Sequence, residues 1–204
     1  MNPSCDVARS AAQLSGVILA GGKSSRFGAD KSQMEFSGRR VVDRLLEVLR
    51  QFPFQSLAII LGRISPLSWP REIQLLSDDQ EGLGPIGGIT TALKHLPRGI
   101  LVVACDMPLI SAPLVAWLLS RYDPHADAVI PRHSQGIEPL FGIYEKGFLP
   151  ALQEAIRRGQ YGLRFLAEEA KVSLVDVPEN FSVEREFVNI NTPEDYERAL
   201  RTMS

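Results

Sequence analysis

The sequence has little cysteine, no long apolar run and no excess of either charge. Two cysteines in 204 residues are too few for a disulfide framework and favour a reduced compartment. No stretch approaches the ~18 consecutive apolar residues that a membrane span needs, and the first 15 residues lack the apolar segment of a signal peptide. Lys and Arg total 22 against 24 for Asp and Glu, which argues against nucleic acid as a partner. We expect a cytoplasmic protein that binds neither membrane nor nucleic acid.

Histidine is equally sparse. The chain has three, at positions 95, 125 and 133, and they form neither an H-E-x-x-H motif nor a recognisable Ser-His-Asp grouping. This distribution gives no support to a zinc protease or a serine hydrolase. We assign the three histidines no role.

Strands and helices alternate along most of the chain. Apolar runs of strand length occur at 17–20, 57–61, 73–76, 100–104, 128–130 and 140–144, and helical periodicity fits 41–49, 89–96, 113–122 and 148–158. A further helix is predicted after Thr192, which can act as its N-cap, with Pro193 in the first turn and Asp195 three residues after the cap. The pattern predicts an α/β fold, with a mostly parallel sheet covered by helices on both faces. We expect a disordered leader over 1–14 and a single domain over 15–204.

The loop after the first predicted strand has the composition of a phosphate-binding loop. Gly21 and Gly22 lack a Cβ, so their backbone N–H groups can approach an anion closely. Lys23, Arg26 and Lys31 supply positive charge. The spacing matches neither the P-loop nor the G-x-G-x-x-G motif of dinucleotide-binding folds. A glycine turn with solvated cations is the alternative, but it accounts poorly for three cations in one short loop.

The run Leu-Ala-Gly-Gly-x-Ser-x-Arg-x-Gly-x-Asp-Lys over residues 19–31 resembles the signature of molybdenum cofactor guanylyltransferases. These enzymes belong to the nucleotidyltransferases with a Rossmann-like fold, so the resemblance implies that fold. It also implies that Leu19, Ala20, Gly21 and Gly22 bind nucleotide. Arg26 and Lys31 would be catalytic, with Lys31 also contacting the nucleotide. Phe27 stands where relatives usually have Met, a change that leaves the phosphate chemistry unaffected.

A carboxylate follows the strand predicted over 100–104. Asp106 lies just past this apolar run, and Pro108 prevents further regular strand pairing. A carboxylate in this position can bind Mg²⁺, which takes one or two protein carboxylates together with phosphate oxygens and water. On spacing alone, a helix cap or turn aspartate is an equal alternative. The segment Cys-Asp-Met-Pro-Leu is similar to the metal-binding segment of the family, which implies that Asp106 is a metal ligand, contacts the nucleotide and is catalytic.

Two acidic residues precede a glycine-rich turn. The segment from Asp78 to Gly88 is similar to a family stretch in which an Asp binds nucleotide and a Gly-Pro-Leu-Ala-Gly-like turn lies against the base. The register favours Asp78, and Asp79 is the alternative. The resemblance also implies nucleotide contacts from Gly84 and Pro85. For the acidic residue that does not bind nucleotide, a solvated loop is the simplest interpretation.

One family feature is missing and another is altered. The nucleotide-binding Asn that usually follows the second strand is absent, and the backbone at Leu61–Gly62 or the side chain of Arg63 are its candidate substitutes. Glu138 stands where relatives often carry Gln or His, so a carboxylate there could alter contacts to a pterin substrate.

The segment 189–193 reads Asn-Ile-Asn-Thr-Pro. In an extended segment Asn189 and Asn191 share one face, so both amides can reach a metal, a phosphate or a second substrate. Turn chemistry ahead of a capped helix is the alternative. The family carries Asn-x-Asn-Thr-Pro at this point, which implies that both side chains lie near the pterin substrate or the metal.

The resemblance covers about 15–203 and implies transfer of GMP from GTP to the terminal phosphate of molybdopterin or its molybdenum-loaded form, with release of pyrophosphate and use of Mg²⁺. It further implies contact with proteins that deliver or accept the cofactor. A cytidylyltransferase acting on the same pterin is the nearest alternative, but the family pairs Leu-Ala-Gly-Gly with guanine and Leu-Ala-Ala-Gly with cytosine. A non-catalytic nucleotide-binding regulator is a second alternative, and it would not need to keep both Lys31 and Asp106.

Overall fold

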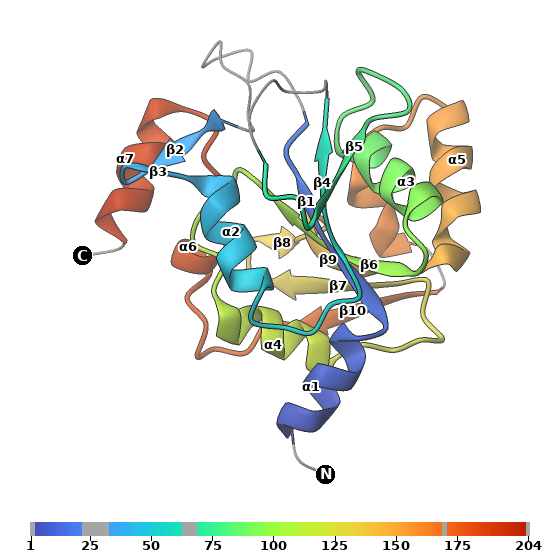
Figure 1. The fold of residues 1–204 in the computed structure, drawn as a ribbon, viewed down its shortest axis with the longest axis horizontal. Helices are drawn as coiled ribbons and strands as arrows, with labels where there is room; N and C mark the ends of the chain where they lie inside the picture. Colours follow the sequence, from blue (N-terminus) through green and yellow to red (C-terminus); the bar gives the residue numbers. More distant parts are fainter. Residues whose placement is uncertain (1–2, 22–32, 63–68, 169–170, 203–204) are drawn as a thin grey trace.

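The protein is built around one mixed β-sheet with helices on both faces (Figure 1). The computed structural model describes residues 3–21, 33–62, 69–168 and 171–202. Among these residues, no helix is long and apolar enough to cross a membrane. The strands of the sheet run in the order β10-β7-β9-β6-β1-β4-β5, with β8 paired to β7. Their bounds are β1 Leu14–Leu19, β4 Leu57–Leu61, β5 Ile73–Ser77, β6 Gly99–Ala104, β7 Ala128–His133, β8 Gly136–Ile137, β9 Phe141–Tyr144 and β10 Val172–Asp176.

Most strand pairs are parallel. β1 lies between β6 and β4, β5 extends the sheet beyond β4, and β10 pairs with β7, all in parallel register. β9 runs antiparallel between β6 and β7. The predicted α/β fold with a mostly parallel sheet is confirmed.

The burial of the strands follows their place in the sheet. Every residue of β1 and of β6 is buried, as expected for central strands covered on both faces. β5 lies at one edge, and most of its residues are exposed or only partly buried. The centre of the sheet is therefore rigidly packed, and this is where the loops that follow β1 and β6 begin.

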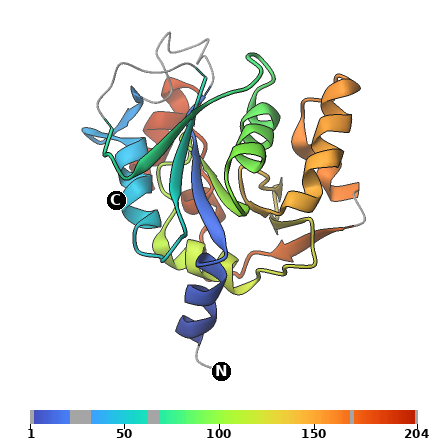
Figure 2. The ribbon, with the colours of Figure 1, turned by 45° about the vertical axis from the view of Figure 1, so that its right-hand side comes forward.

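Helices form a layer on each face (Figure 2). Buried side chains of α2, α4 and α7 belong to one apolar core, and those of α3 and α5 belong to the other. The helices are α1 Pro3–Ala11, α2 Val41–Leu49, α3 Pro85–His95, α4 Ala112–Ser120, α5 Leu149–Arg157, α6 Val183–Glu186 and α7 Pro193–Arg201, with 3₁₀ turns at Lys146–Phe148 and Leu163–Glu168. The sheet thus has a separate core on each side.

The structure corrects the expectation of a disordered leader over 1–14. Residues Pro3–Ala11 form α1, which packs against α4 and buries Ala11 completely. The segment is too short and too polar to suggest a stable helix from its periodicity alone. Its order comes from tertiary contact with α4, since short isolated helices are only marginally stable in water.

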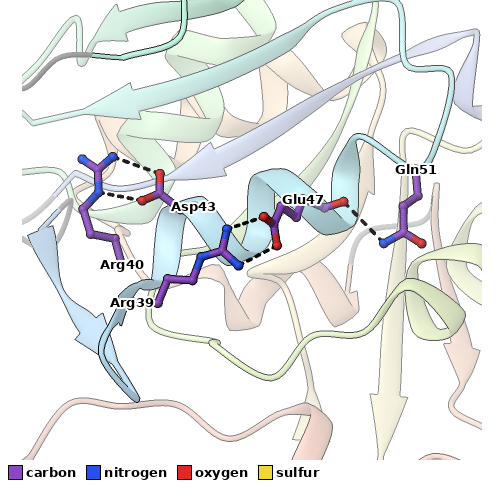
Figure 3. A network of polar contacts seen from close by, with 5 residues as sticks. All are labelled: Arg39, Arg40, Asp43, Glu47 and Gln51. Carbon is purple, nitrogen blue, oxygen red and sulfur yellow. Dashed lines mark hydrogen bonds and ion pairs between the residues drawn. The ribbon is translucent and has the colours of Figure 1, made fainter.

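A short hairpin also escaped the sequence analysis, as did β8 and β10 of the main sheet. β2 (Glu35–Phe36) and β3 (Arg39–Arg40) form the hairpin, which leads directly into α2. Figure 3 shows how charged side chains join the two elements. Arg40 donates to Asp43 in the first turn of α2 at 2.8 and 3.0 Å, and Arg39 pairs with Glu47 one turn later. These arginines are therefore held by carboxylates of α2.

The predicted start of the last helix is confirmed. Thr192 is the N-cap of α7, and its side chain accepts a hydrogen bond from the backbone N–H of Asp195 at 3.2 Å. The Asp195 carboxylate in turn accepts from the N–H groups of Asn191 and Thr192 at 3.0 Å. This reciprocal capping fixes the chain direction just after Asn189 and Asn191.

We predict that Thr192→Ala lowers the free energy of unfolding by about 1 kcal/mol, because it removes an N-cap acceptor and opens the reciprocal pair. Chemical denaturation measures the change. Thr192→Ser keeps the hydroxyl and should stay close to wild type. Equal stability of the Ala variant and wild type would show that the cap contributes nothing.

Candidate functional site

The first part of the site lies where β1 ends between β4 and β6. The backbone N–H of Ala20 donates to Ile60 at 2.9 Å, and that of Cys105 donates to Leu19 at 3.0 Å. Leu19 and Ala20 are buried. The chain after β1 and the chain that carries Asp106 therefore leave the sheet side by side.

Gly21 is required here by the path of the neighbouring chain. A Cβ at this position would lie 2.9 Å from the backbone nitrogen of Gly62, closer than real Cβ contacts. The sequence interpretation gave Gly21 a role in phosphate approach, and the structure adds a packing reason for it. The predicted site residues Gly22, Arg26 and Lys31, together with Arg63, lie outside the described residues.

Asp78 follows β5, at the end of the sheet where the parallel strands β1 and β6 also end. Its backbone N–H donates to Leu61 at 3.0 Å, and its Oδ1 accepts a hydrogen bond from the buried hydroxyl of Thr91 at 3.3 Å. Burial raises the pKa of Asp78 to about 6, while the Thr91 hydrogen bond lowers it and the charge of Asp79 raises it. The carboxylate is thus half-buried and is not paired with a cation among the described residues.

Asp79 has a different environment. Its carboxylate pairs with Lys94 at 3.0 Å and with His95 at 2.8 Å, both at the end of α3. These hydrogen bonds lower the pKa of Asp79. Asp79 also lines a cavity of about 290 Å³ between α3 and α5. Its oxygens already serve as partners for α3, so Asp78 is the better candidate for a ligand contact.

The glycine turn before α3 brings the backbone close to Asp78. Gly84 has φ +70° and serves as the N-cap of α3, with Pro85 at its first position. α3 therefore begins at Pro85, four residues before the predicted start at Ile89, because proline suits the first turn of a helix. A Cβ on Gly88 would lie 3.1 Å from Leu19 Cδ2 and 3.7 Å from Asp78 Oδ1. Gly88 thus faces the ends of β1 and β5.

Asp106 forms the centre of the second part of the site. It is 7% exposed, and its backbone carbonyl accepts a hydrogen bond from the N–H of Ile190 at 2.8 Å. Ile190 itself is buried, so the chain on either side of it is held against the end of β6. The structure therefore brings the predicted residues Asn189 and Asn191 beside Asp106, although their segment is not a regular strand.

A cavity of about 400 Å³ opens beside this segment. Asn189 and Asn191 both line it, together with the edge of Phe187 and the polar side chains of the β7–β8 turn and of α7. The lining residues are Gln135, Val183, Glu184, Phe187, Val188, Asn189, Asn191, Asp195 and Arg198. One aromatic ring among amides and charged groups suits a polar planar ligand.

A histidine–carboxylate pair, which the sequence analysis did not find, lies between Asp106 and this cavity. His133 Nε2 lies 3.2 Å from Glu138 Oε1, and the side chain of His133 is 3% exposed. Its ring packs on Phe187 with centroids 4.9 Å apart. Burial raises the pKa of Glu138; contact with His133 lowers it, and the nearby charge of Asp106 raises it further. No motif in the sequence signals this pair; the tight β7–β8 turn of the structure brings residues five apart together.

The described residues thus present two kinds of surface along one edge of the sheet. The first surface, between β1 and α3, consists of glycine backbone, Leu19 and the half-buried carboxylate of Asp78. The second consists of the carboxylates and amides around Asp106. Within the described part of the chain, His, Cys, Asp and Glu side chains form no group of three or more that could hold a metal ion. The arrangement suits two ligands that meet near Asp106.

We predict that Asp78→Asn becomes more stable relative to wild type as the pH rises from about 4 to about 6, because it removes a carboxylate that folding makes harder to ionise. Below this window both chains carry a neutral side chain, and above it the difference is constant. Partial exposure limits the gain to about 1 kcal/mol. Denaturation curves at several pH values measure it.

Asp79→Asn is the matched control for this measurement. Its pKa is lowered by its hydrogen bonds with His95 and Lys94, so the variant should be less stable than wild type at pH 7, and the gap should close as Asp79 is protonated at low pH. A pH-independent difference between Asp78→Asn and wild type would contradict the assigned environment of Asp78.

Comparison with known proteins places this chain in a family. The model of the MobA-like NTP transferase domain matches residues 16–174. A probable molybdenum cofactor guanylyltransferase from Pelotomaculum thermopropionicum is 33% identical over 92% of each chain. One from Opitutus terrae is 34% identical over 94% of this chain and 96% of its own.

Solved structures agree with this family. The crystal structure of molybdopterin-guanine dinucleotide biosynthesis protein A from Archaeoglobus fulgidus matches 93% of this chain and 98% of its own, with a TM-score of 0.78 and 28% identity. A nucleotidyl transferase from Methanothermobacter shares the fold at a TM-score of 0.66 and 16% identity, covering 93% of this chain and 99% of its own. With the family model matching most of the chain, the protein belongs to the MobA-like NTP transferase domain family and is a nucleotidyltransferase.

Proposed function

We propose that this protein transfers GMP from GTP to the terminal phosphate of molybdopterin, or of its molybdenum-loaded form, and releases pyrophosphate. The relatives named as molybdenum cofactor guanylyltransferases support this activity. The observation that carries it is the hydrogen bonding at the end of β1 and β6, which places Leu19–Gly21 beside Asp106. A nucleotide and a second substrate can meet at that point.

The nucleotide side of the proposed site lies between β1 and α3. Leu19, Ala20 and Gly21 end the central strand, and the turn at Gly84–Pro85 begins α3 opposite them. The half-buried Asp78 carboxylate can accept hydrogen bonds from a base or ribose. Gly88 packs closely against Leu19 and Ile60, so the helix lies directly beside the end of β1. This environment supports Asp78, rather than Asp79, as the nucleotide contact.

The chemistry needs charge neutralisation more than a general base, because the attacking group is already an anionic phosphate. Two anions must be held in line at the α-phosphorus of GTP. In this proposal Lys31 and Arg26 offset charge on the α-phosphate and the leaving pyrophosphate. The backbone of Gly21 and Gly22 orients the triphosphate. Asn189 and Asn191 hold the pterin substrate from the other side of Asp106.

The residues around Asp106 fit a divalent cation, which we take to be Mg²⁺. A buried carboxylate and neighbouring amide oxygens are the hard oxygen donors that Mg²⁺ prefers. When bound, such a cation neutralises charge on phosphate oxygens. Asp106 would hold it, and the segment 189–191 would supply further oxygen atoms.

We predict that Gly88→Ala weakens GTP binding by about tenfold or more, because the new methyl group would press on Leu19 and displace it at the proposed nucleotide contact. Isothermal titration calorimetry measures the affinity. Gly162→Ala, whose Cβ would meet no atom within 4 Å, is the control and should bind GTP as wild type does. Unchanged affinity in Gly88→Ala would remove this face of α3 from the nucleotide site.

The activity itself is tested by pyrophosphate release with molybdopterin and each of the four nucleoside triphosphates. We expect GTP to be preferred. Asp106→Asn should lower kcat/KM by ~10²–10³, the range seen when one preorganised electrostatic contact is lost. Asp123→Asn, on the exposed turn after α4, is the control and should react like wild type.

Two results would contradict the proposal. A preference for CTP would make the protein a cytidylyltransferase on the same pterin. Nucleotide binding without pyrophosphate release from any of the four triphosphates, in protein that folds normally, would favour a regulator.

A further inference from the structure

Glu138 lies in a position that the proposed chemistry does not yet use. It precedes β9, and β9 pairs antiparallel with β6, the strand that leads to Asp106. The backbone N–H of Ala104 donates to Leu140 at 3.0 Å, so the chain around Glu138 runs beside the chain that carries Asp106. The side chain of Glu138 is 17% exposed, so its carboxylate is largely removed from water.

His133 fixes the direction of this carboxylate. The Nδ1 atom of His133 accepts a hydrogen bond from the backbone N–H of Gln135 at 3.1 Å. In the neutral ring the proton therefore sits on Nε2, which donates to Glu138 Oε1 at 3.2 Å. Phe187 packs against the same ring and is itself buried. Because the ring is held on both sides, it holds the Glu138 carboxylate in a fixed position.

Glu138 lies close enough to Asp106 to be affected by its charge, and such a pair of carboxylates needs an explanation. Two like charges in a partly buried place repel one another, and their cost is reduced when a cation binds between them. His133 in the stated tautomer donates a hydrogen bond to Glu138 without adding a positive charge. If residue 138 only had to accept a hydrogen bond from His133, a neutral glutamine would serve equally well.

We propose that Glu138 is the second carboxylate of the divalent cation site at Asp106, and that His133 is the residue that positions it. The inference rests on the proposed function, since that function brings the cation to Asp106. Two carboxylates, with water and phosphate oxygens in the remaining positions, match the usual environment of Mg²⁺. Hydrogen-bonded partners such as His133 commonly orient the ligands of metal sites.

The test is a titration of the full-length chain with Mn²⁺ in the absence of nucleotide, followed by the electron paramagnetic resonance signal of free Mn²⁺. Glu138→Gln keeps the shape of the side chain and removes its charge. We expect its Mn²⁺ affinity to fall by ~10-fold or more, and that of His133→Gln by a smaller factor. Glu154→Gln removes a carboxylate that pairs with surface arginines on α5 and should bind Mn²⁺ like wild type.

Circular dichroism and the unfolding midpoint establish that each variant is folded. The proposal is overturned if Asp106→Asn loses Mn²⁺ binding while folded Glu138→Gln keeps wild-type affinity. It is also overturned if Glu138→Gln and Glu154→Gln weaken binding equally, since the effect would then be one of net charge. Weakened Mn²⁺ binding in Glu138→Gln supports the proposal even if pyrophosphate release shows that the wild-type chain transfers no nucleotide, so the two failures can be told apart.

Discussion

The parallel pairing of β1 with β6 is the constraint on which the site depends. It sets Leu19 opposite Ala104, so that the chain after each strand leaves the sheet at the same edge. Both strands are buried along their whole length, and moving either by one residue would exchange the side chains that face the two apolar cores. The distance between Leu19 and the chain that carries Asp106 is therefore fixed by the core.

The chemistry that we propose for this edge is a problem of like charges. A triphosphate and a second phosphate have to approach one another, and the protein itself places carboxylates at 78, 106 and 138 along the same edge. The carboxylates are tolerated because each is held differently. Asp78 is half-buried against Thr91, with a pKa near 6, and Glu138 is held by His133. In our account, cations then neutralise what remains when the substrates are bound.

Much of the fold followed from the sequence, because it depends on patterns that are local. The apolar runs of β1 and β6, the periodicity of α2 and the cap at Thr192 each determine their own structure. α1 was missed because its order comes from packing on α4, and the β2–β3 hairpin because it is very short. The start of α3 was also predicted too late, because Gly84 and Pro85 begin the helix before its apolar pattern does.

The positions of candidate site residues were predictable where a residue lies in a motif, and less so where its partners come from distant segments. Asn189 was expected near the pterin substrate or the metal, and the hydrogen bond between Ile190 and Asp106 brings its segment beside Asp106. The choice between Asp78 and Asp79 needed the positions of Thr91 and Lys94. His133 carried no motif, and its contact with Glu138 became visible only when the β7–β8 turn was formed.

The most direct test of the central claim is a crystal structure of the protein with GTP and Mn²⁺, with the metal located by its anomalous scattering. The account predicts a metal peak on the Asp106 carboxylate, with the triphosphate over the chain after β1 and the base against Leu19 and the Gly84–Pro85 turn. A nucleotide bound elsewhere, such as in the cavity between α3 and α5, or a metal away from Asp106 would contradict it.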